Sequence, residues 1–251
     1  IFEQFFRILV SSVDTFMLSS FSEPAVAGVG LMSQYVFFLQ ILFNVICIGS
    51  TIILAQYLGA EKSEEELNHI AKGGFIMTMI AAFALMLIVI IGTKPLLSCY
   101  DLEQEVKESA FKYFLIFGGI GAPFTAFNMF QTGLLRTYGY TKETLIVTII
   151  SNLVNVAGNA VAIYGFAGIP ITGTVGVAAA SVLSMIVGNI IMAFFIKRRK
   201  DIQFNIFRSS KVPFKVHKKI LSIGVPTAGE SLSYNIAQIV IMAMISSMGT
   251  F

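Results

Sequence analysis

Four stretches of this chain carry no Lys, Arg, Asp or Glu. They cover residues 24–60, 73–93, 113–135 and 144–196 of the 251. A helix needs about 20 apolar residues to cross the hydrocarbon core of a membrane, so each stretch can hold one crossing helix and the longest can hold two. Only 12% of all residues are charged, against about 25% in soluble domains, and the mean hydropathy is +0.81. The sequence therefore predicts an all-α, polytopic membrane helix bundle, and it argues against a disordered chain, a nucleic-acid-binding module and a disulfide scaffold.

Charged residues and Gly or Pro clusters divide the chain into expected spans of about 20 residues. The seven spans are 1–19, 31–57, 73–92, 113–134, 144–164, 175–196 and 220–249. The uncharged run 144–196 must hold two of them, because glycines and a proline between Gly165 and Gly176 interrupt it in the middle.

Local patterns indicate where some of these helices begin or bend. Ser63 and Glu66 fit a capping box at the start of the third span, and acidic residues up to Glu105 suit the N-terminal end of the fourth. Helix-breaking residues occur in span four, at 118–123, and at the beginning of span seven, at 224–226. Such breaks are either bending points of a moving transporter or static kinks.

The distribution of basic residues predicts the orientation in the membrane. Connections 58–72, 135–143 and 197–219 carry 13 Lys and Arg, whereas the other three connections carry 3. Because basic loops stay in the cytoplasm, we expect the first group and the N-terminal end of the chain to be cytoplasmic. The basic run in 197–219 is read as a topology signal, with binding of acidic lipid as the alternative.

A weak internal repeat predicts a larger, two-lobed protein. Residues 1–22 and 228–249 share five identities at a shift of 227 residues, and Glu3 aligns with Glu230. Span seven has the same direction as span one, as a parallel repeat of two six-span halves requires. We therefore expect 1–196 to be an N-terminal lobe, 197–219 a cytoplasmic basic linker, and 220–251 the first span of a second lobe that is truncated, within a protein of twelve spans.

Ionisable residues inside a span are expensive and are functional candidates by default. Glu3, Arg7 and Asp14 share one face of span one. Arg7 can neutralise Glu3, its neighbour four residues earlier. Asp14 lies two turns farther on, about six residues or roughly 9 Å from the outer end of its helix, and has no such partner in the sequence.

Span five carries a polar face in the same outer half. Ser151, Asn155 and Asn159 recur at every fourth residue and therefore stack along one side of the helix. Asn159 and Ser181, in span six, fall at a depth similar to that of Asp14. Together these oxygen-bearing groups could hold a proton or an alkali cation, or the amides could simply join the helices by hydrogen bonds.

Several short motifs occur in a fixed order along the chain. They are Val13 to Met17 with Ala25 to Gly30, Gln56 to Ala60, Gly133 to Lys142, Asn155 to Gly165, Gly168 to Pro170, and Gly176 to Ser181. Through these motifs the whole chain resembles the multidrug and toxic compound extrusion (MATE) family of secondary transporters.

The resemblance implies two six-helix lobes that alternate between inward-open and outward-open forms. It implies antiport, the export of organic cations or drugs driven by inward flow of Na⁺ or H⁺, with no cofactor. Asp14 is then the coupling carboxylate of the first lobe, assisted by Asn155, Asn159 and Ser181. Many members have Asp in place of Asn159 and Thr in place of Ser181, so this site keeps a single titratable group.

A second-lobe ion site is less defined by the resemblance. Some members couple through a Glu in span seven, at the position that Tyr234 occupies here. Glu230 is either a polar site of the second lobe or a structural counterpart of Glu3. No metal is expected other than Na⁺ at the coupling residues, because the Cys and His residues have no ligand spacing.

Two other functions compete with efflux. A flippase of lipid-linked sugars shares the lobe architecture but needs a strongly basic cavity, and a seven-span receptor is suggested by the bare count of helices. An enzyme is not expected, because no nucleophile–base pair or phosphate-binding loop occurs. The expected partners are small organic cations or drugs and membrane lipid, with no nucleic acid and no obligate protein partner, and the expected location is the cell membrane.

Overall fold

The computed structural model of the protein describes residues 16–19, 21–165, 171–206 and 211–247. Over these residues the chain forms helices and turns without a strand, which confirms the all-α prediction. The elements are α2 (Glu23–Gly59), α3 (Glu64–Ser98), α4 (Gln104–Tyr113), the π-helical segment η1 (Phe114–Ile120), α5 (Ala122–Thr137), α6 (Thr141–Tyr164), α7 (Thr174–Arg198) and α8 (Phe214–Ser247).

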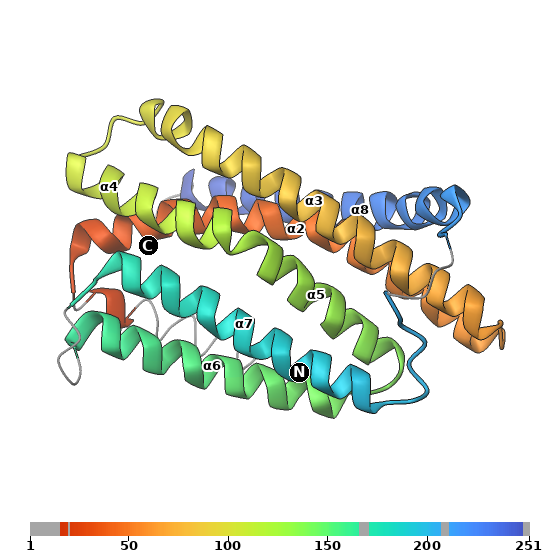
Figure 1. Ribbon diagram of the computed structural model, residues 1–251. Helices are drawn as coiled ribbons and strands as arrows, with labels where there is room; N and C mark the ends of the chain where they lie inside the picture. The colour runs from red at the N-terminus through yellow and green to blue at the C-terminus, as the bar shows by residue number, and fades with distance from the viewer. Residues whose placement is uncertain (1–15, 20, 166–170, 207–210, 248–251) are drawn as a thin grey trace.

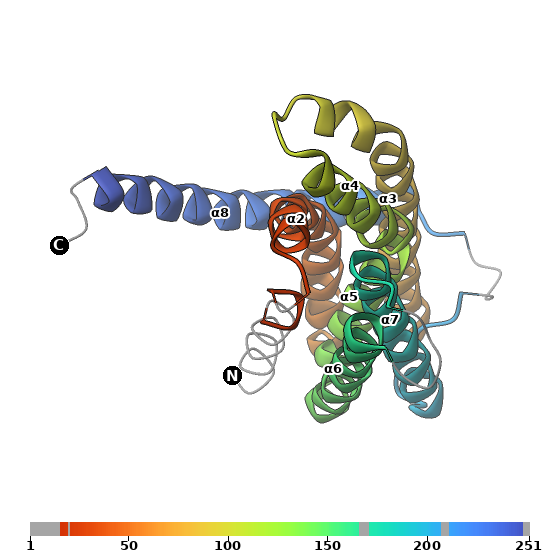
Figure 2. The same cartoon turned by 90° about the vertical axis from the view of Figure 1, so that its left-hand side faces the viewer.

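Helices α2 to α7 pack side by side as one bundle, and α8 diverges from it (Figures 1 and 2). The α6–α7 hairpin forms one side of the bundle, α3 and α4 form the opposite side, and α2 and α5 lie between them. Helix α8 packs against α2 and then leaves the bundle at a steep angle (Figure 2). Its C-terminal part therefore lies away from the other helices.

The helices correspond to the expected spans where both can be compared. Among the described residues, α2, α3, α6 and α7 are long and apolar enough to cross a membrane, and α4 with η1 and α5 makes a fifth, bent candidate. These coincide with the second to sixth expected spans. Most of the first expected span, 1–15, lies outside the described residues, and the described part of α8 is not among these candidates.

Several helices extend beyond the approximate limits of the expected spans. Helix α3 continues to Ser98 and α4 begins at Gln104, so the expected connection 93–112 shrinks to residues 99–103. Helix α2 begins at Glu23 rather than at 31, and α8 begins before residue 220. The additional turns carry exposed charges such as that of Lys94. Hydropathy misses such turns because they are helical outside the hydrocarbon.

Several of the local signals are confirmed. Ser63 Oγ accepts a hydrogen bond from Glu66 N at 3.3 Å and Glu66 Oε2 accepts one from Ser63 N at 3.3 Å, which completes the capping box. Glu105 lies in the first turn of α4. The predicted break in span four exists, because η1 is π-helical and the chain bends by 47° before α5. Helix α8, in contrast, continues through Pro226.

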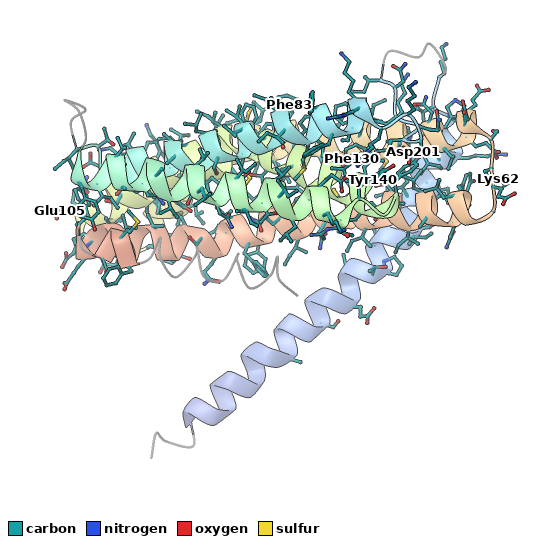
Figure 3. All side chains as sticks on the ribbon, turned by 90° about the horizontal axis from the view of Figure 1, so that it is seen from below. Lys62, Phe83, Glu105, Phe130, Tyr140 and Asp201 are labelled. Carbon is teal, nitrogen blue, oxygen red and sulfur yellow. The ribbon has the colours of Figure 1, made fainter. Side chains whose placement is uncertain are left out.

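One end of the bundle carries the described parts of the three basic connections, and we call it the basic end (residues 60–63, 138–140, 199–206 and 211–213). Figure 3 places Lys62, Tyr140 and Asp201 toward this end and Glu105 at the other. Tyr140 Oη donates a hydrogen bond to Asp201 Oδ2 at 2.7 Å, and this bond raises the pKa of Tyr140 above its usual value. Asn205 N donates to the side-chain oxygen of Asn68 at 2.7 Å. The segment between α7 and α8 is therefore attached to the bundle.

Apolar packing holds the same segment. The Phe204 ring lies 5.4 Å from that of Phe130 and 5.7 Å from that of Phe75, measured between ring centroids. Phe130 and the nearby Ile220 of α8 are almost completely buried. This cluster joins α3, α5, α8 and the connecting segment into one core near the basic end.

Candidate functional site

Two hydrogen bonds tie the residues just before α7 to the last turn of α6. The amides of Thr172 and Gly173 both donate to the carbonyl of Ala162, at 3.0 and 3.1 Å. Gly173 has a φ of +55°, and Gly165, at the end of α6, has a φ of +71°. Residues other than glycine tolerate such positive φ values poorly. The predicted break in the uncharged run 144–196 is thus confirmed as a helical hairpin.

Small residues let the two helices of the hairpin approach closely. A Cβ atom placed on Gly158 would lie 2.6 Å from the Cβ of Ala180, and one placed on Gly176 would lie 2.5 Å from the Cβ of Ala162. Membrane helices commonly use such small residues to bring their backbones together. Short polar side chains near these contacts can therefore reach across the interface.

Three of the four expected ion-coupling residues meet at this interface. Asn155 Nδ2 donates a hydrogen bond to Ser181 Oγ at 3.1 Å, and Asn159 Nδ2 donates to Asn155 Oδ1 at 3.3 Å. Ser181 Oγ in turn donates to the carbonyl of Val177 at 3.1 Å. Asn159 is 1% exposed and Asn155 is 7% exposed. We call Asn155, Asn159 and Ser181 the amide network.

The remaining candidates are not part of the network that the described residues form. Asp14, Glu3 and Arg7 lie outside the described residues, so the structure does not position them. Glu230 lies on α8 with an exposed side chain, apart from the amide network. Tyr234 is within the same helix. The chain therefore gathers the polar groups of span five and span six, as the spacing predicted.

The amide network offers neutral oxygen donors in a buried position. Amide carbonyls and hydroxyls are ligands for hard cations, and they also accept hydrogen bonds from a protonated carboxyl group. A neutral network supplies no charge to balance a cation, so a neighbouring carboxylate would strengthen such a site. Within the described residues, no three Cys, His, Asp or Glu side chains form a cluster that could hold a metal.

A groove between α2 and α5 is a feature that the sequence analysis missed. It has a volume of about 480 Å³ and lies in the half of the bundle nearer the basic end. Its polar lining includes Gln40, Asn44, Thr51, Thr125, Asn128, Thr132 and Arg136. The signal was present in the sequence, since these residues recur at spacings of three, four or seven along two otherwise apolar spans, which places them on one face of each helix.

Comparisons of the sequence identify relatives over nearly the whole chain. The profile of the MatE family matches residues 1–161. The chain is 33% identical over 248 residues to the uncharacterized transporter YisQ of Bacillus subtilis, and the aligned region covers 96% of this chain and 53% of YisQ. It is 30% identical over 239 residues to the probable multidrug resistance protein NorM of Thermotoga maritima, covering 93% of this chain and 50% of NorM. The chain thus spans about half the length of these relatives.

Solved structures share the fold. A crystal structure of MATE in the straight conformation superposes with a TM-score of 0.87 at 22% identity, over 98% of this chain and 54% of that one. An outward-facing multidrug resistance MATE family transporter of the MOP superfamily gives a TM-score of 0.84 at 23% identity, over 94% and 51%. The bundle is therefore arranged as in part of a MATE transporter, and the sequence matches show that the chain belongs to the MatE family.

Proposed function

We propose that this chain forms the N-terminal half of a transporter that exports organic cations or drugs in exchange for inward-moving Na⁺ or H⁺. Membership of the MatE family supports the transport function, and the name of the NorM relative supports multidrug efflux. The proposal adds that the substrate is moved without chemical change, so the protein is not an enzyme and needs no cofactor. Its expected partners are small organic cations or drugs and the surrounding lipid.

The observation that carries the proposal is the buried amide network between α6 and α7. Asn155, Asn159 and Ser181 place their polar atoms within one hydrogen-bonded group in the membrane-spanning part of the bundle. We propose that Asp14 completes this group as the coupling residue. Binding or release of a cation would then change the charge of the site, and a cation that binds the two arrangements of the lobe with different affinity shifts their populations.

The domain organisation is proposed on the same basis. We assign 1–196 to a first lobe, 197–219 to a linker, and 220–251 to the beginning of a second lobe. The steep departure of α8 from the bundle supports this division (Figure 2). The linker contacts the first lobe more closely than expected, because its residues 201–205 are hydrogen-bonded to α3 and to the α5–α6 connection.

The groove bears on the choice between efflux and a lipid-linked-sugar flippase. A flippase that binds phosphate needs several basic groups in its cavity. Among the described residues that line the groove, Arg136 is the only charged one. A lining that is mostly neutral and hydrogen-bonding, with a single basic group, therefore supports export of organic compounds.

A reconstituted transporter tests the proposal. The full-length protein that contains this chain is placed in vesicles loaded with a fluorescent organic cation, and efflux is compared under a Na⁺ gradient and a pH gradient. Asp14→Asn keeps the shape and hydrogen bonding of the side chain but cannot titrate, so gradient-driven efflux should be lost. Glu3→Gln combined with Arg7→Gln serves as the control and should retain most of the activity. Uphill efflux by Asp14→Asn at the unmodified rate would remove Asp14 from the coupling site.

A further inference from the structure

The α5 wall of the α2–α5 groove is a polar stripe that ends in a positive charge. Thr125, Asn128, Thr132 and Arg136 all line the groove and follow one another at intervals of three or four residues, so they share one face of the helix. Arg136 lies in the last turn of α5, next to the basic end. Thr125 lies about 16 Å deeper in the bundle, by the rise of an α-helix. The stripe therefore leads from a buried hydroxyl to a guanidinium group.

The α2 wall places its amides at the opposite, deeper end of the groove. Helices α2 and α5 run in the same direction (Figure 1), and they end at Gly59 and Thr137, beside the basic connections. Gln40 and Asn44 line the groove several turns before the end of α2. The groove therefore has hydrogen-bonding amides at its deep end and the charge of Arg136 at its mouth.

The size and walls of the groove suit a drug-sized organic molecule. Its volume of about 480 Å³ lies within the range of roughly 300–1,000 Å³ that is usual for small-molecule sites. Its apolar lining includes Ile48 and Ile52 of α2 and the thioethers of Met129 and Met185, and thioethers adapt to ligands of different shape. Such walls can hold many partly apolar compounds, so the polar groups of the groove decide which compounds bind best.

The charge of the lining favours a compound with a carboxylate group. The guanidinium of an arginine binds a carboxylate with two parallel hydrogen bonds, and Arg136 is placed to do so at the mouth of the groove. None of the described residues that line the groove is Asp or Glu, so a cationic group gains no ion pair from them. The amide oxygens of Gln40 and Asn44 can accept hydrogen bonds from the N–H groups of a protonated amine. One end of the groove thus suits an anionic group and the other suits an amine.

We propose that the α2–α5 groove binds the exported compound lengthwise, with a carboxylate of that compound at Arg136 and a protonated amine near Gln40 and Asn44. The inference rests on the proposed function, since it names a preferred class among the exported organic compounds. That class is zwitterionic and partly apolar, and Arg136 is the residue that selects it.

A matched pair of dyes tests the carboxylate subsite. A rhodamine with a free carboxylic acid is zwitterionic at neutral pH, whereas its methyl ester is a cation of nearly the same shape. The full-length parent protein in detergent should bind the free acid about tenfold more tightly than the ester, the scale of one charge-assisted contact. Arg136→Gln should weaken binding of the free acid to the same extent and should not weaken binding of the ester. Fluorescence anisotropy measures both dissociation constants.

Two further variants separate this contact from a general effect of charge. Lys142 is exposed in the first turn of α6, near the same end of the bundle but outside the groove. Lys142→Gln therefore removes an equal charge and should leave both dissociation constants unchanged. Asn44→Leu removes an amide at the deep end of the groove, and it should weaken binding of both dyes equally because both carry the same amino groups. Thermal unfolding in detergent establishes that each variant is folded.

Protection of an introduced cysteine locates the bound dye. Ala55 lines the groove and is exposed, whereas the neighbouring Gln56 is exposed but is not part of the lining. Cys47 and Cys99 are first replaced by alanine. In that background, Ala55→Cys should react more slowly with a methanethiosulfonate reagent when the free-acid dye is bound, and Gln56→Cys should react at the same rate with and without the dye. Addition of Arg136→Gln should remove the protection at position 55 at the same dye concentration.

The outcomes distinguish the carboxylate subsite from the proposed function. Equal affinity of the parent for both dyes, or parent-like binding of the free acid by folded Arg136→Gln, would overturn the subsite while leaving cation-driven efflux standing. If Arg136→Gln does not fold, the preference of the parent and the protection at position 55 decide the same question. Unchanged binding in Asn44→Leu would overturn the lengthwise orientation. If the free acid binds as expected but neither a Na⁺ gradient nor a pH gradient drives its export from vesicles, the proposed function fails and the groove is a binding site only.

Discussion

Whether Asn155 reaches Ser181 depends on residues that have almost no side chain. Gly158 and Gly176 leave α6 and α7 close enough for one amide to contact one hydroxyl at 3.1 Å. In a membrane, a polar side chain that misses its partner has no water to replace it. The glycines therefore position the network, although they carry no chemistry themselves.

Substitution of Asn159 tests the number of titratable groups at this site. Asn159 is buried and donates to Asn155, so Asn159→Asp places a carboxyl group in this network, beside the carboxyl group of Asp14 that we propose completes it. Because two neighbouring carboxyl groups titrate as a coupled pair, the pH profile of efflux should gain a second step. Measuring efflux by the full-length protein across a range of pH checks this. A profile identical to that of the parent would mean that position 159 is not part of the coupling site.

At the scale of elements, the α2–α8 contact is the joint between the bundle and the diverging helix. A Cβ atom on Gly49 would lie 2.2 Å from the carbonyl oxygen of Ile220, and one on Gly224 would lie 2.0 Å from that of Val45. Both contacts are with backbone, which cannot rotate away as a side chain can. The two helices cross so closely because each presents a glycine there.

Gly224→Ala should therefore destabilise the protein. Overpacking of a close contact typically costs about 1–3 kcal/mol, and here the free energy of unfolding should fall by an amount in that range. Thermal unfolding in detergent, followed for parent and variant, measures the effect. Gly229→Ala is the control on the same helix, since a Cβ there has no atom within 4 Å. Equal melting of Gly224→Ala and the parent would contradict the close crossing.

Some features of these elements could be predicted from the sequence and others could not, for physical reasons. Charge-free runs revealed the helices because water and hydrocarbon demand different side chains, and the spacing of Asn155 and Asn159 revealed their shared face. Hydropathy did not reveal how far helices extend beyond the hydrocarbon, as at Glu23 and Ser98. Nor did a single span reveal the α2–α5 groove, because that groove exists only where the polar stripes of two helices meet.

At the scale of the whole molecule, the fold places the connections at the ends of the bundle that the distribution of basic residues predicts. The hydrogen bond from Tyr140 to Asp201 and that from Asn205 to Asn68 bring the three basic connections to one end of the bundle. The loop at 99–103, the end of α6 and the beginning of α7 lie at the other end (Figure 1). The alternation that the charge count requires is therefore present in the fold, and the side of the membrane that each end faces stays a prediction.

Labelling of cysteine residues can determine which side of the membrane each end of the bundle faces. Cys99 is exposed at the end away from the basic connections, whereas Cys47 is buried. Because basic loops remain cytoplasmic, an impermeant thiol reagent added to intact cells should label the native protein at Cys99. In Cys99→Ser with Lys200→Cys, the same reagent should label only after the cytoplasmic side is opened, since Lys200 is exposed at the basic end. The reverse pattern would invert the orientation and place the basic end on the outside of the cell.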